Sequence, residues 1–107
     1  MQTESYILLK LTENSIKKFK DIFDEKYSKI AEEQIIIDFS EKINIEIQEL
    51  LLFLKVSSKH RTNGMSFVII CTGIEIDEIP DKLSVVPTLT EALDILEMDA
   101  IERDLGF

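Results

Sequence analysis

The polar residues best placed for chemistry follow the most apolar short stretch of the chain. Residues 34–39 include three consecutive isoleucines, and an acid, Asp38, and a hydroxyl, Ser40, stand at the end of the stretch. Consecutive β-branched residues predict a strand that is buried on both faces. Because ligands and reactive groups in open α/β sheets gather at the carboxyl ends of the strands, a phosphoacceptor, a nucleophile or a ligand loop is expected here.

Asp38 has two interpretations. Receiver-type domains place a phosphorylated aspartate at a strand end, but that chemistry needs an acidic metal cluster and a lysine beside it, and no such set stands out in the sequence. An aspartate also bonds readily to the backbone two residues further on and so caps a turn. We predict the capping role for Asp38.

The single histidine and the single cysteine offer little further chemistry. His60 has no second histidine with which to share a metal, and we interpret it as a cation that favours the negative end of a helix. Cys71 ends an apolar run, which is typical of a small core residue rather than a nucleophile. With no glycine-rich phosphate loop and no evident pairing of nucleophile and base, we predict no enzyme, no metal and no cofactor.

The elements that must position these residues alternate between strand and helix. Short apolar runs predict strands at 6–11, 34–39, 65–71 and 83–86. Segments whose apolar residues recur every three or four positions predict helices at 16–31, 45–61 and 88–104. The last helix opens with a capping box formed by Thr88 and Glu91. Asn44 is the expected cap of the second helix. Such alternation predicts an α/β fold with a mostly parallel sheet of about four strands flanked by three helices. We expect one domain over residues 1–107, with the C-terminal helix reaching about residue 105.

The charge of the chain is concentrated in its last third. The net charge is −9, and residues 75–107 hold ten acids against two bases, Lys82 and Arg103. Such a surface repels phosphate backbones, which disfavours nucleic acid as a partner, and it attracts basic proteins or simply keeps the chain soluble. No apolar run approaches a membrane span, the N-terminus has no signal-peptide pattern and a lone Cys71 forms no internal disulfide. These observations predict a cytoplasmic protein without a membrane partner.

Two helices carry more apolar residues than a sheet needs to cover. Residues 50–54 are five consecutive apolar residues, whereas one helix face needs a stripe of only about 100°. Either neighbouring loops cover the excess, or a partner or second copy does so at Ile45, Leu52, Phe53 and Val56. In the last helix a second stripe follows the first and is rotated from it. Its members, which we interpret as a docking tail, include Met98, Ile101, Leu105 and Phe107.

Three segments in this order resemble a STAS domain, the fold of bacterial anti-sigma factor antagonists that also occurs on sulphate transporters. Residues 34–40, QIIIDFS, resemble the apolar strand of the family that ends in Asp-Leu-Ser. Residues 64–71 resemble its glycine and next strand, and VVPTLTEAL at 85–93 resembles its closing strand and last helix start. The family usually has an extra first strand, for which residues 1–5 are too short, and a helix where 72–82 leave room for a turn or one helical turn.

The resemblance implies a regulatory protein whose partner is an anti-sigma factor or a kinase-like protein. Family members carry Asp-Ser-Ser-Gly before the second helix, and phosphorylation of one serine releases the partner. The aligned residues here are Glu46, Ile47, Gln48 and Glu49, so the family serine position is Ile47 and no phosphorylation is expected. Glu46 or Glu49 is either a permanent phosphate mimic or an ordinary acid of a first helical turn. The partner-binding site predicted around the strand end consists of Ser40, Asn44, Ile45, Glu46, Ile47 and Gln48.

We therefore expect a non-catalytic, STAS-like interaction module without a serine switch, and a homodimer is one form it could take. The alternative is a domain that senses or binds a nucleotide or lipid in the crevice at the strand ends, with Ser40, Asn44, Glu46 and Thr72 as its contacts.

Overall fold

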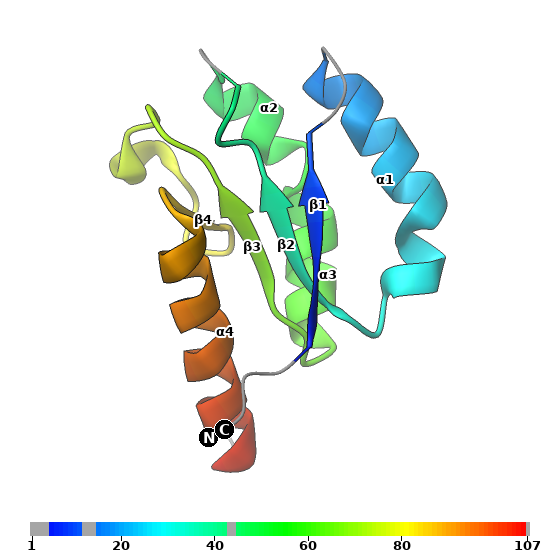
Figure 1. Cartoon of the computed structure of the whole chain (residues 1–107), viewed down its shortest axis with the longest axis vertical. Helices are drawn as coiled ribbons and strands as arrows, with labels where there is room; N and C mark the ends of the chain where they lie inside the picture. The colour runs from blue at the N-terminus through cyan, green and yellow to red at the C-terminus, as the bar shows by residue number, and fades with distance from the viewer. Residues whose placement is uncertain (1–4, 12–14, 43–44, 107) are drawn as a thin grey trace.

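Four short strands lie side by side in one sheet, with helices on both of its faces (Figure 1). The computed structural model describes residues 5–11, 15–42 and 45–106. The elements follow the chain as β1 (Tyr6–Lys10), α1 (Ile16–Ile30), β2 (Gln34–Asp38), α2 (Ile47–Leu51), α3 (Leu54–Thr62), β3 (Phe67–Ile70), the 3₁₀ turn η1 (Ile76–Glu78), β4 (Ser84–Val86) and α4 (Leu89–Asp104).

The sheet has the order β1-β2-β3-β4, and all three neighbouring pairs are parallel. The predicted α/β class with a mostly parallel four-stranded sheet is therefore confirmed. Each strand lies next to the strand that precedes it in sequence, and the sheet always grows in the same direction. Right-handed crossover connections therefore place the helices α1, α2 and α3 on one face of the sheet. The chain leaves β4 by the other face, which α4 covers (Figure 1).

The helix starts show why these segments fold as they do. The backbone N–H of Lys18 donates to the Ser15 hydroxyl at 3.4 Å, and that of Glu91 donates to the Thr88 hydroxyl at 3.2 Å, so each hydroxyl caps a first turn. Gly64, which follows α3, has a φ of 86°, a conformation that glycine adopts without steric cost. The connection before β4 holds only η1, as its length predicted.

The second predicted helix is not continuous, and the described part of the chain has four α-helices instead of three. The N–H groups of Leu52 and Phe53 bond to carbonyls three residues back, at 3.3 and 3.0 Å, which tightens the backbone between α2 and α3. The buried residues nevertheless recur at helical spacing on both sides of this junction, as Leu50, Phe53, Ser57 and His60. The two helices therefore still turn one face to the core.

The larger core lies between the sheet and the helices α1, α2 and α3. Its centre is a cluster of phenylalanines at 19, 23, 39, 53 and 67, with ring centroids 5.5–6.4 Å apart. A smaller core joins α4 to the opposite face through Ile36, Val68, Ile70, Ala92 and Leu96. The described helices include none whose length and apolar content would suffice to cross a membrane.

Candidate interaction site

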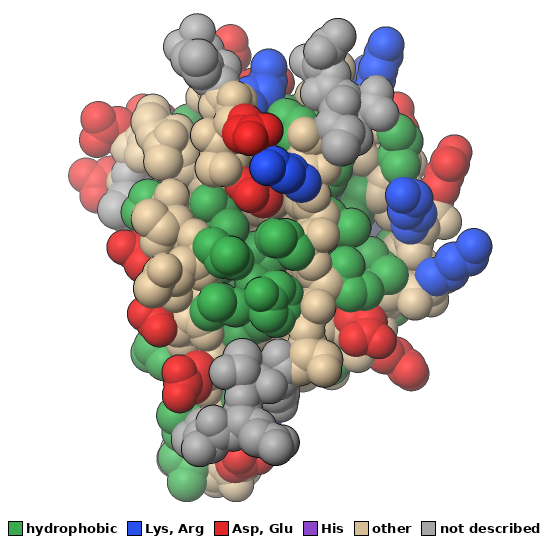
Figure 2. Space-filling view, in the orientation of Figure 1, with side chains coloured by type: hydrophobic (Ala, Val, Ile, Leu, Met, Phe, Trp, Pro, Cys, Tyr) green, Lys and Arg blue, Asp and Glu red, His purple; other side chains and the backbone are tan. Residues whose placement is uncertain are grey.

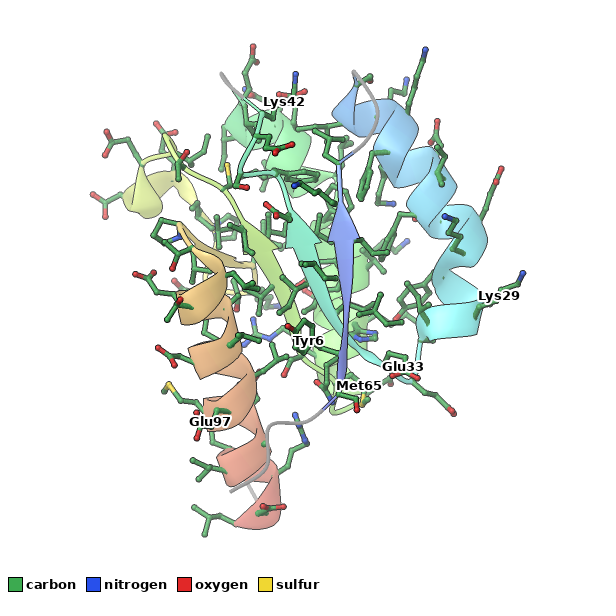
Figure 3. All side chains as sticks on the ribbon, viewed as in Figure 1. Tyr6, Lys29, Glu33, Lys42, Met65 and Glu97 are labelled. Carbon is green, nitrogen blue, oxygen red and sulfur yellow. The ribbon has the colours of Figure 1, made fainter. Side chains whose placement is uncertain are left out.

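Asp38 is the last residue of β2, and Ser40 follows it two residues later. Asp38 Oδ1 accepts a hydrogen bond of 2.8 Å from the backbone N–H of Ser40, so the predicted turn-capping role is confirmed. Ser40 is exposed, and beside it Lys10 of β1 pairs with Glu41 at 3.2 Å. Figure 3 shows Lys42 near this end of the sheet and Glu33 and Met65 near the other. The predicted site residue Asn44 lies outside the described residues.

The start of α2 is held by its own acids. Glu46 is the N-cap residue, and its backbone N–H donates to Glu49 Oε1 at 2.9 Å. The carboxylate of Glu49 thus caps the N-terminus of α2. Glu46 and Gln48 are exposed, and Ile47 at the family serine position is half-buried. Of the predicted partner contacts in this loop, Glu46 and Gln48 are the accessible ones.

Two predicted partner contacts are wrong. Ile45 is 6% exposed and Phe53 is fully buried, because Phe53 packs into the phenylalanine cluster and Ile45 packs against the same core. Leu52, by contrast, is 42% exposed, and Val56 is half-buried. The structure adds Leu51, which is 38% exposed and which the sequence analysis did not single out. Leu51 and Leu52 follow Gln48 by three and four residues, so each of the two leucines lies beside Gln48 at the end of α2.

The interpretation of His60 as a cation at the end of a helix is also wrong. Its side chain is fully buried, with Nδ1 2.8 Å from the Tyr27 hydroxyl and Nε2 2.7 Å from the Glu33 carbonyl. Since a carbonyl only accepts, Nε2 carries the proton and Nδ1 accepts from Tyr27. Burial lowers the pKa of His60 against the opposing effect of the Glu33 carbonyl, and it raises the pKa of Tyr27. The neutral ring therefore ties the end of α1 to α3, a structural role.

Cys71 lies within the core at the carboxyl end of β3, as predicted. Burial, with a smaller contribution from the negative charge of Glu49, raises the pKa of its thiol. A thiol in that state is a poor nucleophile. Among the described residues, no group of three or more metal-ligating side chains comes together.

The outer face of α4 is apolar in its second half. Ala92, Leu96 and Ala100 face the sheet, while the predicted docking residues Met98, Ile101 and Leu105 are 60%, 37% and 65% exposed. Phe107 lies outside the described residues. The helix is fixed from its inner side, where the Ser66 hydroxyl donates to Asp99 Oδ2 at 2.6 Å. Within the described part of the chain, Met98, Ile101 and Leu105 are therefore exposed on the side of α4 that faces away from the sheet.

The face that carries α4 is also apolar beside that helix. Figure 2 shows hydrophobic side chains gathered between α4 and the β1 edge. Leu8, which pairs with Ile36 in the register and so shares its face, is 43% exposed.

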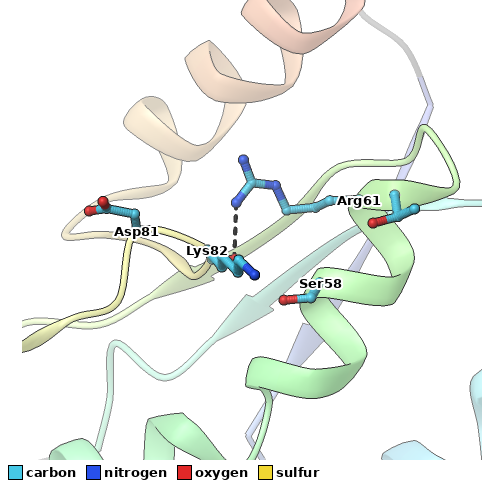
Figure 4. A pocket seen from close by; sticks show the side chains of 5 residues that line it. Ser58, Arg61, Asp81 and Lys82 are labelled. Carbon is cyan, nitrogen blue, oxygen red and sulfur yellow. Dashed lines mark hydrogen bonds between the residues drawn. The ribbon is translucent and has the colours of Figure 1, made fainter.

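An open pocket of about 350 Å³ lies between α3 and the segment that leads into β4 (Figure 4). It is lined by Ser58, Arg61, Thr62, Asp81 and Lys82, and Arg61 Nη1 donates to the Lys82 carbonyl at 3.0 Å. Its lining residues come from α3, which leads into β3, and from the segment just before β4, so the pocket lies near the amino ends of these strands. Ligands in α/β sheets favour the carboxyl ends, so this pocket does not correspond to the predicted crevice, and the nucleotide or lipid alternative stays a prediction.

Together, the sheet and the exposed apolar groups define a class: a small parallel α/β domain whose described helices carry exposed apolar side chains. Comparison with protein-family models and with curated proteins finds no match to the chain.

Proposed function

We propose that the protein is a non-catalytic interaction module that binds a protein partner through the exposed side of α2. We call this side the α2 surface and define it as Glu46, Gln48, Leu51 and Leu52. The resemblance of residues 34–40 and 85–93 to STAS domains supports a regulatory role, with an anti-sigma factor or kinase-like protein as the partner class.

The observation that carries the proposal is the pairing of two exposed leucines with a rigid support. Leu51 and Leu52 are 38% and 42% exposed, while Leu50 and Phe53 on either side of them are fully buried. The backbone beneath the leucines is thus anchored, and little ordering is needed when a partner binds, which favours affinity. Exposed apolar side chains on a fixed helix, rimmed by Glu46 and Gln48, fit the usual apolar centre and polar rim of an interface.

The chemistry of this surface also indicates how it is regulated. A STAS protein with a serine at the position of Ile47 releases its partner when the serine is phosphorylated, and a half-buried isoleucine accepts no phosphate. Glu49 is engaged in capping α2, so it does not present a free carboxylate in place of a phosphate. Control of the complex then comes from the amount of each protein or from a signal other than phosphorylation of this position.

The proposal predicts that Leu52→Ser weakens partner binding at least about fivefold, since truncating a central apolar anchor costs more than about 1 kcal/mol. The tagged full chain is used to capture proteins from its native lysate, and the affinity for a captured partner is then measured with both proteins purified. The expected result is a partner retained by the wild type and lost by the variant.

Ile22→Ser is the matched control, because Ile22 is an apolar residue of α1 that is 37% exposed. It is expected to leave binding within about twofold, since a substitution outside an interface changes binding little. Capture of no specific protein over a range of salt concentrations would contradict the proposal. Equal binding by the Leu52 and Ile22 variants would move the interface away from the α2 surface.

A further inference from the structure

We propose that the outer face of α4 is a second docking surface that binds a basic amphipathic helix of a partner protein. The proposal rests on the proposed interaction function, but it concerns a different surface and a defined partner chemistry. We call this surface the α4 seam and define it as Met98, Ile101 and Leu105.

The spacing and exposure of these residues make a continuous apolar strip. Steps of three and four residues place Met98, Ile101 and Leu105 above one another on a helix, which is the spacing of a coiled-coil seam. They are 60%, 37% and 65% exposed, while Ala92, Leu96 and Ala100 meet the sheet from the other side. Figure 1 shows the C-terminal end of α4 extending beyond the lower ends of the strands. A second helix could therefore lie along the seam without touching the strands.

The flanks of the seam carry one sign of charge. On a helix with 3.6 residues per turn, Glu97 and Asp104 border the seam on one side and Glu91 and Glu102 on the other, and Asp94 continues its line toward the N-terminus. All five of these acids are exposed, and Figure 2 shows acidic side chains along this edge of the molecule. The one base of α4, Arg103, is half-buried on the inner side. A partner that covers the seam therefore meets acids on both flanks.

This charge selects among the possible occupants. In coiled coils, charges that flank the apolar seam decide which helix pairs with which, and like charges oppose pairing. A second copy of α4 would bring acids against acids, and an anionic membrane or a nucleic acid would be repelled in the same way. A helix with apolar residues at steps of three and four and with Lys or Arg on both sides satisfies the strip and the flanks together.

The test uses the folded full chain and two synthetic helices. One peptide has leucine at the seam positions and lysine at the flanking positions, and the other is identical except for glutamate at the flanks. Binding is measured by calorimetry at low and moderate salt, and amide chemical shifts map the contact. We expect the lysine peptide to bind and shift residues 94–105, at least about tenfold more tightly than the glutamate peptide, with affinity falling as salt screens the flanks.

Matched variants separate the seam from general attraction to an acidic protein. Met98→Ser with Leu105→Ser is expected to weaken binding at least about tenfold, whereas Leu89→Ser, on the same helix and 38% exposed, should change it less than about twofold. Circular dichroism confirms that each variant is folded. The proposal would be overturned if the double variant and Leu89→Ser bound the lysine peptide equally well, or if the wild type bound the two peptides equally well. It would also be overturned if the protein associated with itself and the double variant abolished that association. Because Leu52→Ser tests the α2 surface, failure of the proposed function and failure of the α4 seam are read from different variants.

Discussion

Replacing Phe53 with alanine is expected to lower the free energy of unfolding by about 3–5 kcal/mol, the usual cost of truncating a buried aromatic side chain. Phe53 is fully buried. Its ring centroid lies 5.8 Å from those of Phe23 and Phe39, and 6.3 and 6.4 Å from those of Phe19 and Phe67. Removal of this ring leaves a cavity between the sheet, α1 and α3. Since small domains are stable by about 5–15 kcal/mol, the loss removes a large part of the total.

Leu52→Ala is the control, because its side chain is adjacent in sequence and 42% exposed. It should cost only about 1 kcal/mol, since 42% of its surface already meets water in the folded protein and truncation removes less buried apolar surface than at Phe53. Urea denaturation followed by circular dichroism measures both variants. A small loss for Phe53→Ala, or equal losses for the two, would show that Phe53 is a surface residue and would restore it as a partner contact.

The contrast between Leu52 and Phe53 shows where sequence reasoning reached its limit. The strands and helices follow from apolar runs, caps and Gly64, and the parallel sheet follows from their alternation. Within residues 50–54, however, every position is apolar, so the pattern does not indicate which of them face the core. The buried face continues through Ser57 and His60, and because both residues are polar, their burial was not expected from the sequence.

His60 was misjudged for a related reason. Its neighbours in sequence, Lys59 and Arg61, are exposed bases at the end of a helix, and the sequence therefore suggests that His60 is a cation like them. Its hydrogen-bond partners are Tyr27 and Glu33, which lie at and beyond the end of α1. Only the packing of α1 beside α3 brings these atoms within reach, and a sequence pattern does not encode that contact. The α4 seam was predictable, because its apolar residues repeat with helical spacing after the sheet-facing stripe.

The burial of His60 predicts that the protein loses stability as the pH falls below about 6.5, the usual histidine pKa. Burial lowers the pKa of His60 in the folded state. Below pH 6.5 the unfolded chain therefore takes up a proton that the folded protein still refuses, and protonation favours unfolding. The stabilisation is complete above pH 6.5 and is lost progressively as the pH falls toward the folded-state pKa. The slope has an upper limit of about 1.4 kcal/mol per pH unit, which corresponds to one proton.

His60→Gln isolates this effect, because the chain has one histidine and its 21 acids are common to both proteins. The glutamine amide can still donate toward the Glu33 carbonyl, but it does not titrate. Free energies of unfolding are measured by urea denaturation between pH 7.5 and 5.0. The wild type is expected to lose stability relative to the variant below pH 6.5 and to run parallel to it above. Parallel curves over the whole range would mean that the ring accepts a proton in the folded state as readily as in the unfolded chain. The hydrogen bond from the Tyr27 hydroxyl to Nδ1 argues against that result, because a protonated Nδ1 has no lone pair left to accept it.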